Sequence, residues 1–84
     1  AAEALGWMVY HTYDSRRSAR GFPDLVLVRP PRLLFVEVKS DKGKFSPDQE
    51  AWMEALARVE TAGAGIECYL WRPADWEELT RVLR

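Results

Sequence analysis

Two apolar runs separated by a proline-rich turn constrain the fold of this chain more than any other feature. The first run is DLVLV, Asp24 to Val28, and the second is LLFVEVK, Leu33 to Lys39. Apolar residues at consecutive positions require burial on both faces of a sheet, so both runs are predicted to be interior strands. The intervening RPPR is short, and its prolines force a turn. The two runs are therefore expected to form an antiparallel hairpin.

Local patterns predict further elements on both sides of this hairpin. In chain order they are a helix stub ended by Gly6, a strand over Trp7–Tyr13, a helix over 47–61, a strand over Ile66–Trp71 and a helix opened by Pro73 or Asp75. The central helix has the clearest start, because Ser46 is a good N-cap and Gln49 completes a capping box. The predicted fold class is α/β, with a mixed central sheet flanked by helices.

Size and charge limit the organisation and the partners. Eighty-four residues make a single domain, residues 1–84, and the formal net charge is −1. A nucleic-acid partner would therefore have to be bound by local basic clusters rather than by a global field. The lone Cys68 excludes an internal disulfide and a Cys-rich zinc site, which makes a reducing, intracellular location the default. Neither a signal peptide nor an apolar run of about 20 residues is visible.

Three charged residues gather on one face of the predicted hairpin. Residues two apart in a strand share a face, so Glu37 and Lys39 project the same way. A turn centred on Pro30 and Pro31 places Asp24 opposite Glu37. The hairpin is therefore expected to bring two carboxylates and one ammonium together.

Adjacent carboxylates repel each other by about 1–4 kcal/mol near a surface, so one of them binds a proton or a cation sits between them. Carboxylate oxygens completed by water suit Mg²⁺ or Mn²⁺, and a neighbouring lysine can orient water and stabilise phosphoryl charge. This set predicts metal-assisted hydrolysis of a phosphodiester. The alternative is an ordinary exposed edge strand, with Glu37 and Lys39 in a surface ion pair and Asp24 in a turn after Pro23.

The residues around these charges resemble a known family. GFPD followed by VEVKS is similar to the signature of the PD-(D/E)xK nuclease superfamily, and EVKSDKGKFSPDQEAW resembles its VRR-NUC branch. The resemblance covers the chain from Gly6 to Leu83. It implies a restriction-endonuclease-like core with the order αβββαβ and a C-terminal helix. Each motif is weak alone, but their joint occurrence at this spacing is specific.

The resemblance also implies roles for individual residues. Asp24 and Glu37 would be ligands of Mg²⁺ or Mn²⁺, with the Val38 carbonyl as a third protein oxygen. Lys39 would be the catalytic lysine. Gln49 matches the glutamine that approaches the active site in the family, although the capping box alone also explains it.

A further metal-binding acid is often carried on the first helix in this family. Glu3 is the only N-terminal candidate, but it lies close to Gly6, and the family acid is usually further upstream. Because the sequence begins at Ala1 without Met, we expect this acid either at Glu3 or before Ala1.

Basic residues on either side of the motifs are candidate DNA contacts, and solvated loops are the alternative. They are Arg16, Arg17, Arg20, Lys42 and Lys44. The resemblance favours a homodimeric, metal-dependent endonuclease for branched DNA, most of all a Holliday junction resolvase in the cytoplasm of a bacterial cell or phage-infected host. The alternatives are a flap- or linear-DNA nuclease of the same family and a catalytically silent DNA-binding module.

Overall fold

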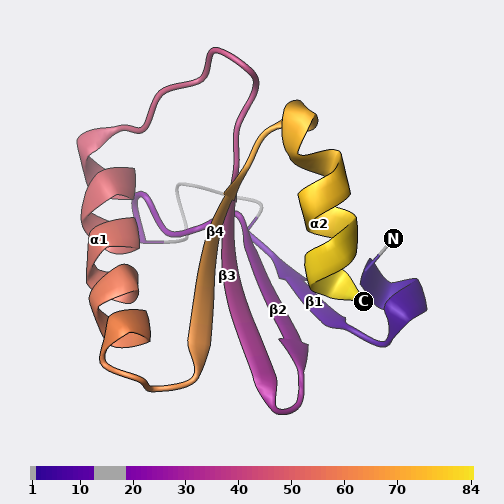
Figure 1. Cartoon of the computed structure of the whole chain (residues 1–84). Helices are drawn as coiled ribbons and strands as arrows, with labels where there is room; N and C mark the ends of the chain where they lie inside the picture. The colour runs from indigo at the N-terminus through magenta and orange to yellow at the C-terminus, as the bar shows by residue number, and fades with distance from the viewer. Residues whose placement is uncertain (1, 13–18) are drawn as a thin grey trace.

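Four strands form one mixed sheet in the part of the chain that the structure, a computed structural model, describes: residues 2–12 and 19–84. The strands are β1 (Met8–His11), β2 (Leu25–Arg29), β3 (Arg32–Val38) and β4 (Ile66–Trp71). They lie in the order β1–β2–β3–β4, with antiparallel pairs except for the parallel pair of β3 and β4. Figure 1 shows α1 (Pro47–Thr61) and α2 (Trp76–Leu83) on opposite sides of the sheet. The predicted mixed sheet flanked by helices is confirmed.

The ends of the chain differ slightly from the sequence prediction. The N-terminal stub is a 3₁₀ turn, η1 (Ala2–Leu5), and a second turn, η2 (Pro73–Asp75), leads into α2. The first strand was expected over 7–13, but β1 ends at His11, and Tyr13 lies outside the described residues. Chain direction changes at Gly6, whose φ of 89° favours glycine.

The β2–β3 hairpin has the predicted antiparallel pairing. Leu25 lies opposite Val36, and Arg29 lies opposite Arg32 across the Pro30–Pro31 turn. This turn is symmetric about the two prolines, so it sets the register of the whole ladder. The consequence for function lies at the open end of the hairpin, where the register continues to Asp24 and Glu37.

Side chains alternate between the two faces of the sheet, as the pleat requires. On the α2 face lies the buried core, formed by Trp7, Leu27, Leu34, Val36, Trp71 and Leu83. On the α1 face, Phe35 packs edge-to-face against Phe22, with ring centroids 6.3 Å apart, and Phe22 packs in turn on Trp52 at 5.0 Å. Both faces of the hairpin are therefore packed, as its unbroken apolar runs predict.

Helix α1 starts where the sequence predicts. The Ser46 Oγ accepts a hydrogen bond from the Gln49 backbone N–H at 3.2 Å, and the Gln49 Oε1 accepts one from the Ser46 backbone N–H at 2.9 Å. This reciprocal pair satisfies two donors that the first turn of a helix leaves without partners. Cap formation therefore fixes the Gln49 side chain at the start of the helix.

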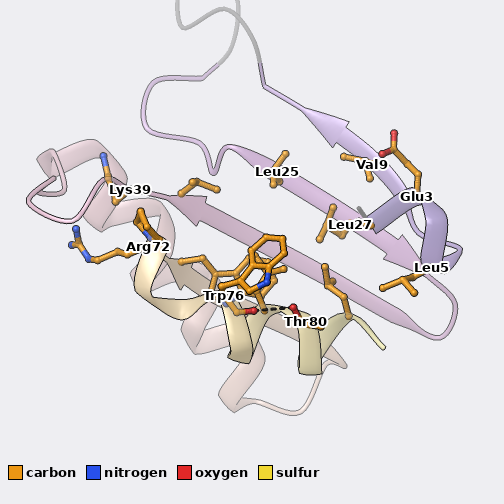
Figure 2. A pocket seen from close by; sticks show the side chains of 15 residues that line it. Glu3, Leu5, Val9, Leu25, Leu27, Lys39, Arg72, Trp76 and Thr80 are labelled. Atoms are coloured by element: carbon orange, nitrogen blue, oxygen red, sulfur yellow. Dashed lines mark hydrogen bonds between the residues drawn. The ribbon is translucent and has the colours of Figure 1, made fainter.

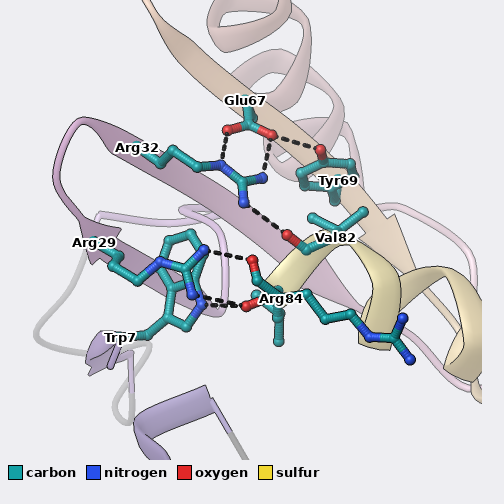
Figure 3. Close-up of polar contacts among 8 residues, drawn as sticks. Trp7, Arg29, Arg32, Glu67, Tyr69, Val82 and Arg84 are labelled. Atoms are coloured by element: carbon teal, nitrogen blue, oxygen red, sulfur yellow. Dashed lines mark hydrogen bonds and ion pairs between the residues drawn. The ribbon is translucent and has the colours of Figure 1, made fainter. Parts of the chain in front are cut away.

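Two arginines anchor the C-terminal helix to the hairpin (Figure 3). Arg29 donates to the carbonyls of Leu83 and Arg84, and Arg32 donates to the Val82 carbonyl as well as to both oxygens of Glu67. Their guanidinium groups lie 4.5 and 5.1 Å from the ring centroid of Trp7, whose Nε1–H donates to the Leu83 carbonyl at 2.9 Å. The last carbonyls of α2 are thereby satisfied by side chains.

Helix α2 leaves part of its sheet face uncovered. A groove of about 550 Å³ lies between α2, η1 and the sheet, with Glu3 near one end and Lys39 near the other (Figure 2). Large apolar side chains that line it remain exposed, namely Leu5, Val9, Val38 and Trp76. Within the described ranges, none of the helices combines the length and apolar character that a membrane crossing requires.

Candidate active site

Asp24 and Glu37 meet at the open end of the hairpin. The pairing of Leu25 with Val36 continues by one residue to place Asp24 across from Glu37. Asp24 directly precedes β2, whereas Glu37 is the penultimate residue of β3. The juxtaposition expected from the sequence is thus a property of the hairpin register.

Backbone groups hold Asp24 in place. Its Oδ2 accepts a hydrogen bond from the Val38 backbone N–H at 2.9 Å, and its carbonyl accepts one from the Thr12 backbone N–H at 2.9 Å. The carboxylate is therefore fixed to β3, while the main chain is fixed to the residue that follows β1. A hydrogen bond from an amide to a carboxylate is charge-assisted and stronger than a neutral one.

The Glu37 side chain is buried from solvent. It is 1% exposed, and its Oε2 has no hydrogen-bond partner among the described residues. Burial, and then the neighbouring Asp24 carboxyl, raise the pKa of Glu37 to about 8, against a smaller lowering by Lys39. At neutral pH the isolated site consequently favours a proton on Glu37, which is the behaviour expected where a cation would otherwise balance two carboxylates.

Gln49 connects the lysine to the buried carboxyl. Its Oε1 accepts a hydrogen bond from the Lys39 Nζ at 2.8 Å, and its Nε2 donates to the Glu37 Oε1 at 3.4 Å. The same Oε1 is the acceptor of the helix cap. The Lys39 Nζ also lies 5.7 Å from the ring centroid of Phe45. Helix α1 thereby brings a polar group of its first turn to the end of β3.

The other predicted site residues are placed less centrally. Glu3 is exposed in η1 and lies at the far end of the groove from Lys39, so it is not brought to the pair of carboxylates (Figure 2). Arg20, Lys42 and Lys44 are exposed, and Arg20 contributes its backbone carbonyl to the Trp52 Nε1–H at 3.1 Å. The candidate DNA contacts at positions 16 and 17 lie outside the described residues.

Two residues for which the sequence predicted no role in shaping the site, Thr12 and Arg72, hold its surroundings in place. The Thr12 hydroxyl donates to the Pro23 carbonyl at 3.1 Å, directly beside Asp24. The Arg72 guanidinium donates to the carbonyls of Ser40 and Asp41, which ties the basic turn after Lys39 to the end of β4. Both contacts join residues that are distant in sequence, so local patterns carried no signal for them.

The donor set fits a hard divalent cation. Asp24 and Glu37 present carboxylate oxygens to each other, and the Glu37 Oε2 is buried without a partner among the described residues. Oxygen ligands of this kind suit Mg²⁺ and Mn²⁺, which keep several waters when few protein ligands are present. Across residues 2–12 and 19–84 no cluster of three or more His, Cys, Asp or Glu side chains could hold a metal ion.

Comparison with known proteins assigns the chain to a family. Residues 1–70 match the sequence profile of the VRR-NUC domain. The chain belongs to the VRR-NUC family. The match covers both hairpin strands, helix α1 and nearly all of β4, so every candidate site residue of this VRR-NUC chain falls within it. A search of curated proteins finds none that matches the chain.

Two solved structures are similar to this VRR-NUC chain. One is described as a VRR_NUC domain, with a TM-score of 0.60, 28% sequence identity, and coverage of 95% of this chain and 82% of the other. The other is Hjc, a Holliday junction resolvase from the archaeal hyperthermophile Archaeoglobus fulgidus, with a TM-score of 0.55, 27% identity and 86% of this chain covered. The chain spans 59% of the length of that resolvase. Its mixed sheet with helices on both faces is a restriction-endonuclease-like fold.

Proposed function

We propose that this VRR-NUC domain is a Mg²⁺- or Mn²⁺-dependent endodeoxyribonuclease for branched DNA, and specifically a Holliday junction resolvase that acts as a homodimer. The observation that carries the proposal is the pair Asp24 and Glu37 at the open end of the hairpin, with Lys39 joined to Glu37 through Gln49. The resemblance to a Holliday junction resolvase supports the choice of DNA substrate. A dimer suits a four-way junction because two symmetric sites can cut two strands.

The four residues named above form a constellation, and we assign roles in the proposed hydrolysis to its members. Asp24 and Glu37 would hold the cation, with the Val38 carbonyl as a further protein oxygen, and Glu37 would have to be deprotonated to do so. A bound divalent cation would lower the pKa of the attacking water and neutralise charge on the phosphate. The Lys39 ammonium, held by the Gln49 Oε1 at 2.8 Å, donates to a phosphate oxygen as negative charge develops on it.

Overall, one phosphorus–oxygen bond to the attacking water forms, and one phosphorus–oxygen bond to the leaving sugar oxygen breaks. The proton of the water passes to solvent, and the leaving oxygen acquires a proton. Arg16, Arg17, Arg20, Lys42 and Lys44 are proposed to hold the DNA through its phosphates, without reading its sequence.

Cleavage of matched DNA substrates tests the proposal. Fluorescent four-way junctions, flaps and linear duplexes of one base composition are incubated with Mg²⁺, Mn²⁺ or EDTA, and the mass of the protein in the same buffer is measured by light scattering. We expect junction cleavage by a dimer in either metal, none in EDTA, and a loss of at least about 100-fold for Lys39→Ala and Asp24→Asn.

Glu77→Gln and Arg81→Ala serve as charge controls, because both side chains are exposed on α2, on the opposite side of the sheet from α1. They should cut at the wild-type rate. Binding of junctions without cleavage, or unchanged cleavage by Lys39→Ala, would refute the enzymatic role. Preferential cutting of flaps or linear duplexes would instead replace the resolvase assignment with the other nuclease type.

A further inference from the structure

Of the two carboxylates, Asp24 is the one that does not belong to a regular element. It follows the segment 20–23 and precedes β2, so the direction of its side chain depends on how that segment is held. Glu37, by contrast, lies within β3, and Gln49 lies in the first turn of α1. The contacts of the segment before Asp24 therefore decide how well the two carboxylates are aligned.

One side of this segment is held by Thr12, which follows β1. The Thr12 hydroxyl donates to the Pro23 carbonyl at 3.1 Å, and the Thr12 backbone N–H donates to the Asp24 carbonyl at 2.9 Å. These two carbonyls belong to the peptide planes on either side of the Asp24 Cα. Since each peptide unit is planar, fixing both planes fixes φ and ψ of Asp24, and with them the direction of its Cα–Cβ bond.

The other side of the segment is held by α1. Trp52 donates its Nε1–H to the Arg20 carbonyl at 3.1 Å and packs edge-to-face on Phe22. Gly21 lies so close to the helix that an added Cβ would be 2.4 Å from the Asp48 backbone. The start of the segment is thus pressed against the helix turn that carries Gln49, and Thr12 fixes its end.

We propose that Thr12 is a positioning residue that aims the Asp24 carboxylate at the site shared with Glu37. The effect of Thr12 on metal binding and cleavage rests on the function proposed above for Asp24, whereas its effect on the direction of the carboxylate does not. With both peptide planes fixed, the Asp24 Oδ2 reaches the Val38 N–H, so this amide reports whether the carboxylate is in place. Without the Thr12 hydroxyl, the plane between Pro23 and Asp24 is free to rotate, and that contact weakens.

The test compares Thr12→Val, which keeps the shape and removes the hydroxyl, with Thr12→Ser, which keeps the hydroxyl. Thr80→Val is the matched control, because its hydroxyl also donates to a carbonyl, that of Trp76, but within α2. Native-state hydrogen exchange at the Val38 amide is measured by NMR in EDTA, relative to the Leu34 amide of the same strand. Mn²⁺ affinity is measured by calorimetry without DNA, and kcat and KM are measured on junctions.

For Thr12→Val we expect Val38 exchange to accelerate about tenfold relative to Leu34, and Mn²⁺ affinity and kcat to fall about tenfold, at the lower end of what loss of a ligand-supporting contact costs. KM for DNA should stay within twofold. For Thr12→Ser and Thr80→Val, Val38 exchange, Mn²⁺ affinity and kcat should all stay within threefold of the wild type. Unchanged Val38 exchange in Thr12→Val, or an equal loss in Thr12→Ser, overturns the proposal. If the wild type cuts none of the DNAs while Thr12→Val still accelerates exchange at the Val38 amide, the nuclease proposal fails and the positioning role stands.

Discussion

Replacing Glu37 by glutamine should remove the loss of stability that the metal-free protein shows as the pH rises. The pKa of Glu37 in the folded protein is about 8, above the ordinary value of 4.5 that applies after unfolding. Between these values the folded state keeps a proton that the unfolded state releases. The stabilising contribution is therefore complete below about pH 4.5 and is lost as the pH rises through about 8. Each pKa unit is worth about 1.4 kcal/mol, and relaxation around the carboxylate reduces the full value, so we expect a loss of about 2–4 kcal/mol.

Urea denaturation followed by circular dichroism, in EDTA at half-unit steps from pH 5 to 8.5, measures this loss. Glu37→Gln cannot titrate at that position. Its free energy of unfolding should therefore equal that of the wild type within about 1 kcal/mol at pH 5 and exceed it by about 2–4 kcal/mol at pH 8.5. Glu50→Gln, an exposed change on α1, should follow the wild-type profile. A difference between wild type and Glu37→Gln that is constant across the range would show that the pKa of Glu37 is not raised in the folded protein.

Three further outcomes follow from contacts described above. Excess Mg²⁺ should stabilise the wild type more at pH 8 than at pH 6 and leave Glu37→Gln unaffected, in the same urea assay, because the cation competes with the proton. In thermal unfolding, Gly21→Ala should lower the free energy of unfolding by at least about 2 kcal/mol more than Gly63→Ala does. Both glycines have φ above 80°, but only Gly21 lies against a helix. Equal losses would contradict this close packing. In the same thermal assay, Trp7→Phe should lower the free energy of unfolding by about 1–3 kcal/mol, because the Leu83 carbonyl loses one donor. Trp76 is 68% exposed, so Trp76→Phe should lower it by less than about 0.5 kcal/mol.

The features that the sequence predicted are those set by short-range rules. A symmetric turn at two prolines determines which residues of the hairpin face each other, so the meeting of Asp24 and Glu37 could be derived before the fold was known. The start of α1 was equally accessible, because Ser46 and Gln49 form their cap within a single helical turn. In both cases the residues that interact are joined by a stretch of chain with few available conformations.

The features that escaped prediction depend on packing between distant segments. Nothing near Thr12 indicates that its hydroxyl reaches the Pro23 carbonyl, because that contact exists only once β1 pairs with β2. Arg29 and Arg32 flank the prolines of the turn, and the sequence gives no sign that they bind the last carbonyls of α2. The position of Glu3, far along the groove from Lys39, likewise follows from how η1 packs on the sheet.

The double engagement of Gln49 restricts which amino acid this position accepts. A capping box alone is satisfied by glutamine or glutamate, because both offer an oxygen to the N-cap amide. At this position glutamate would lose the Nε2–H that faces Glu37 and would place a third carboxyl group beside a pair that already disfavours negative charge. A substitution neutral for the helix would thus be disruptive for the site. Libraries varied at position 49 and selected first for folding and then for DNA cleavage should lose glutamate only at the second step.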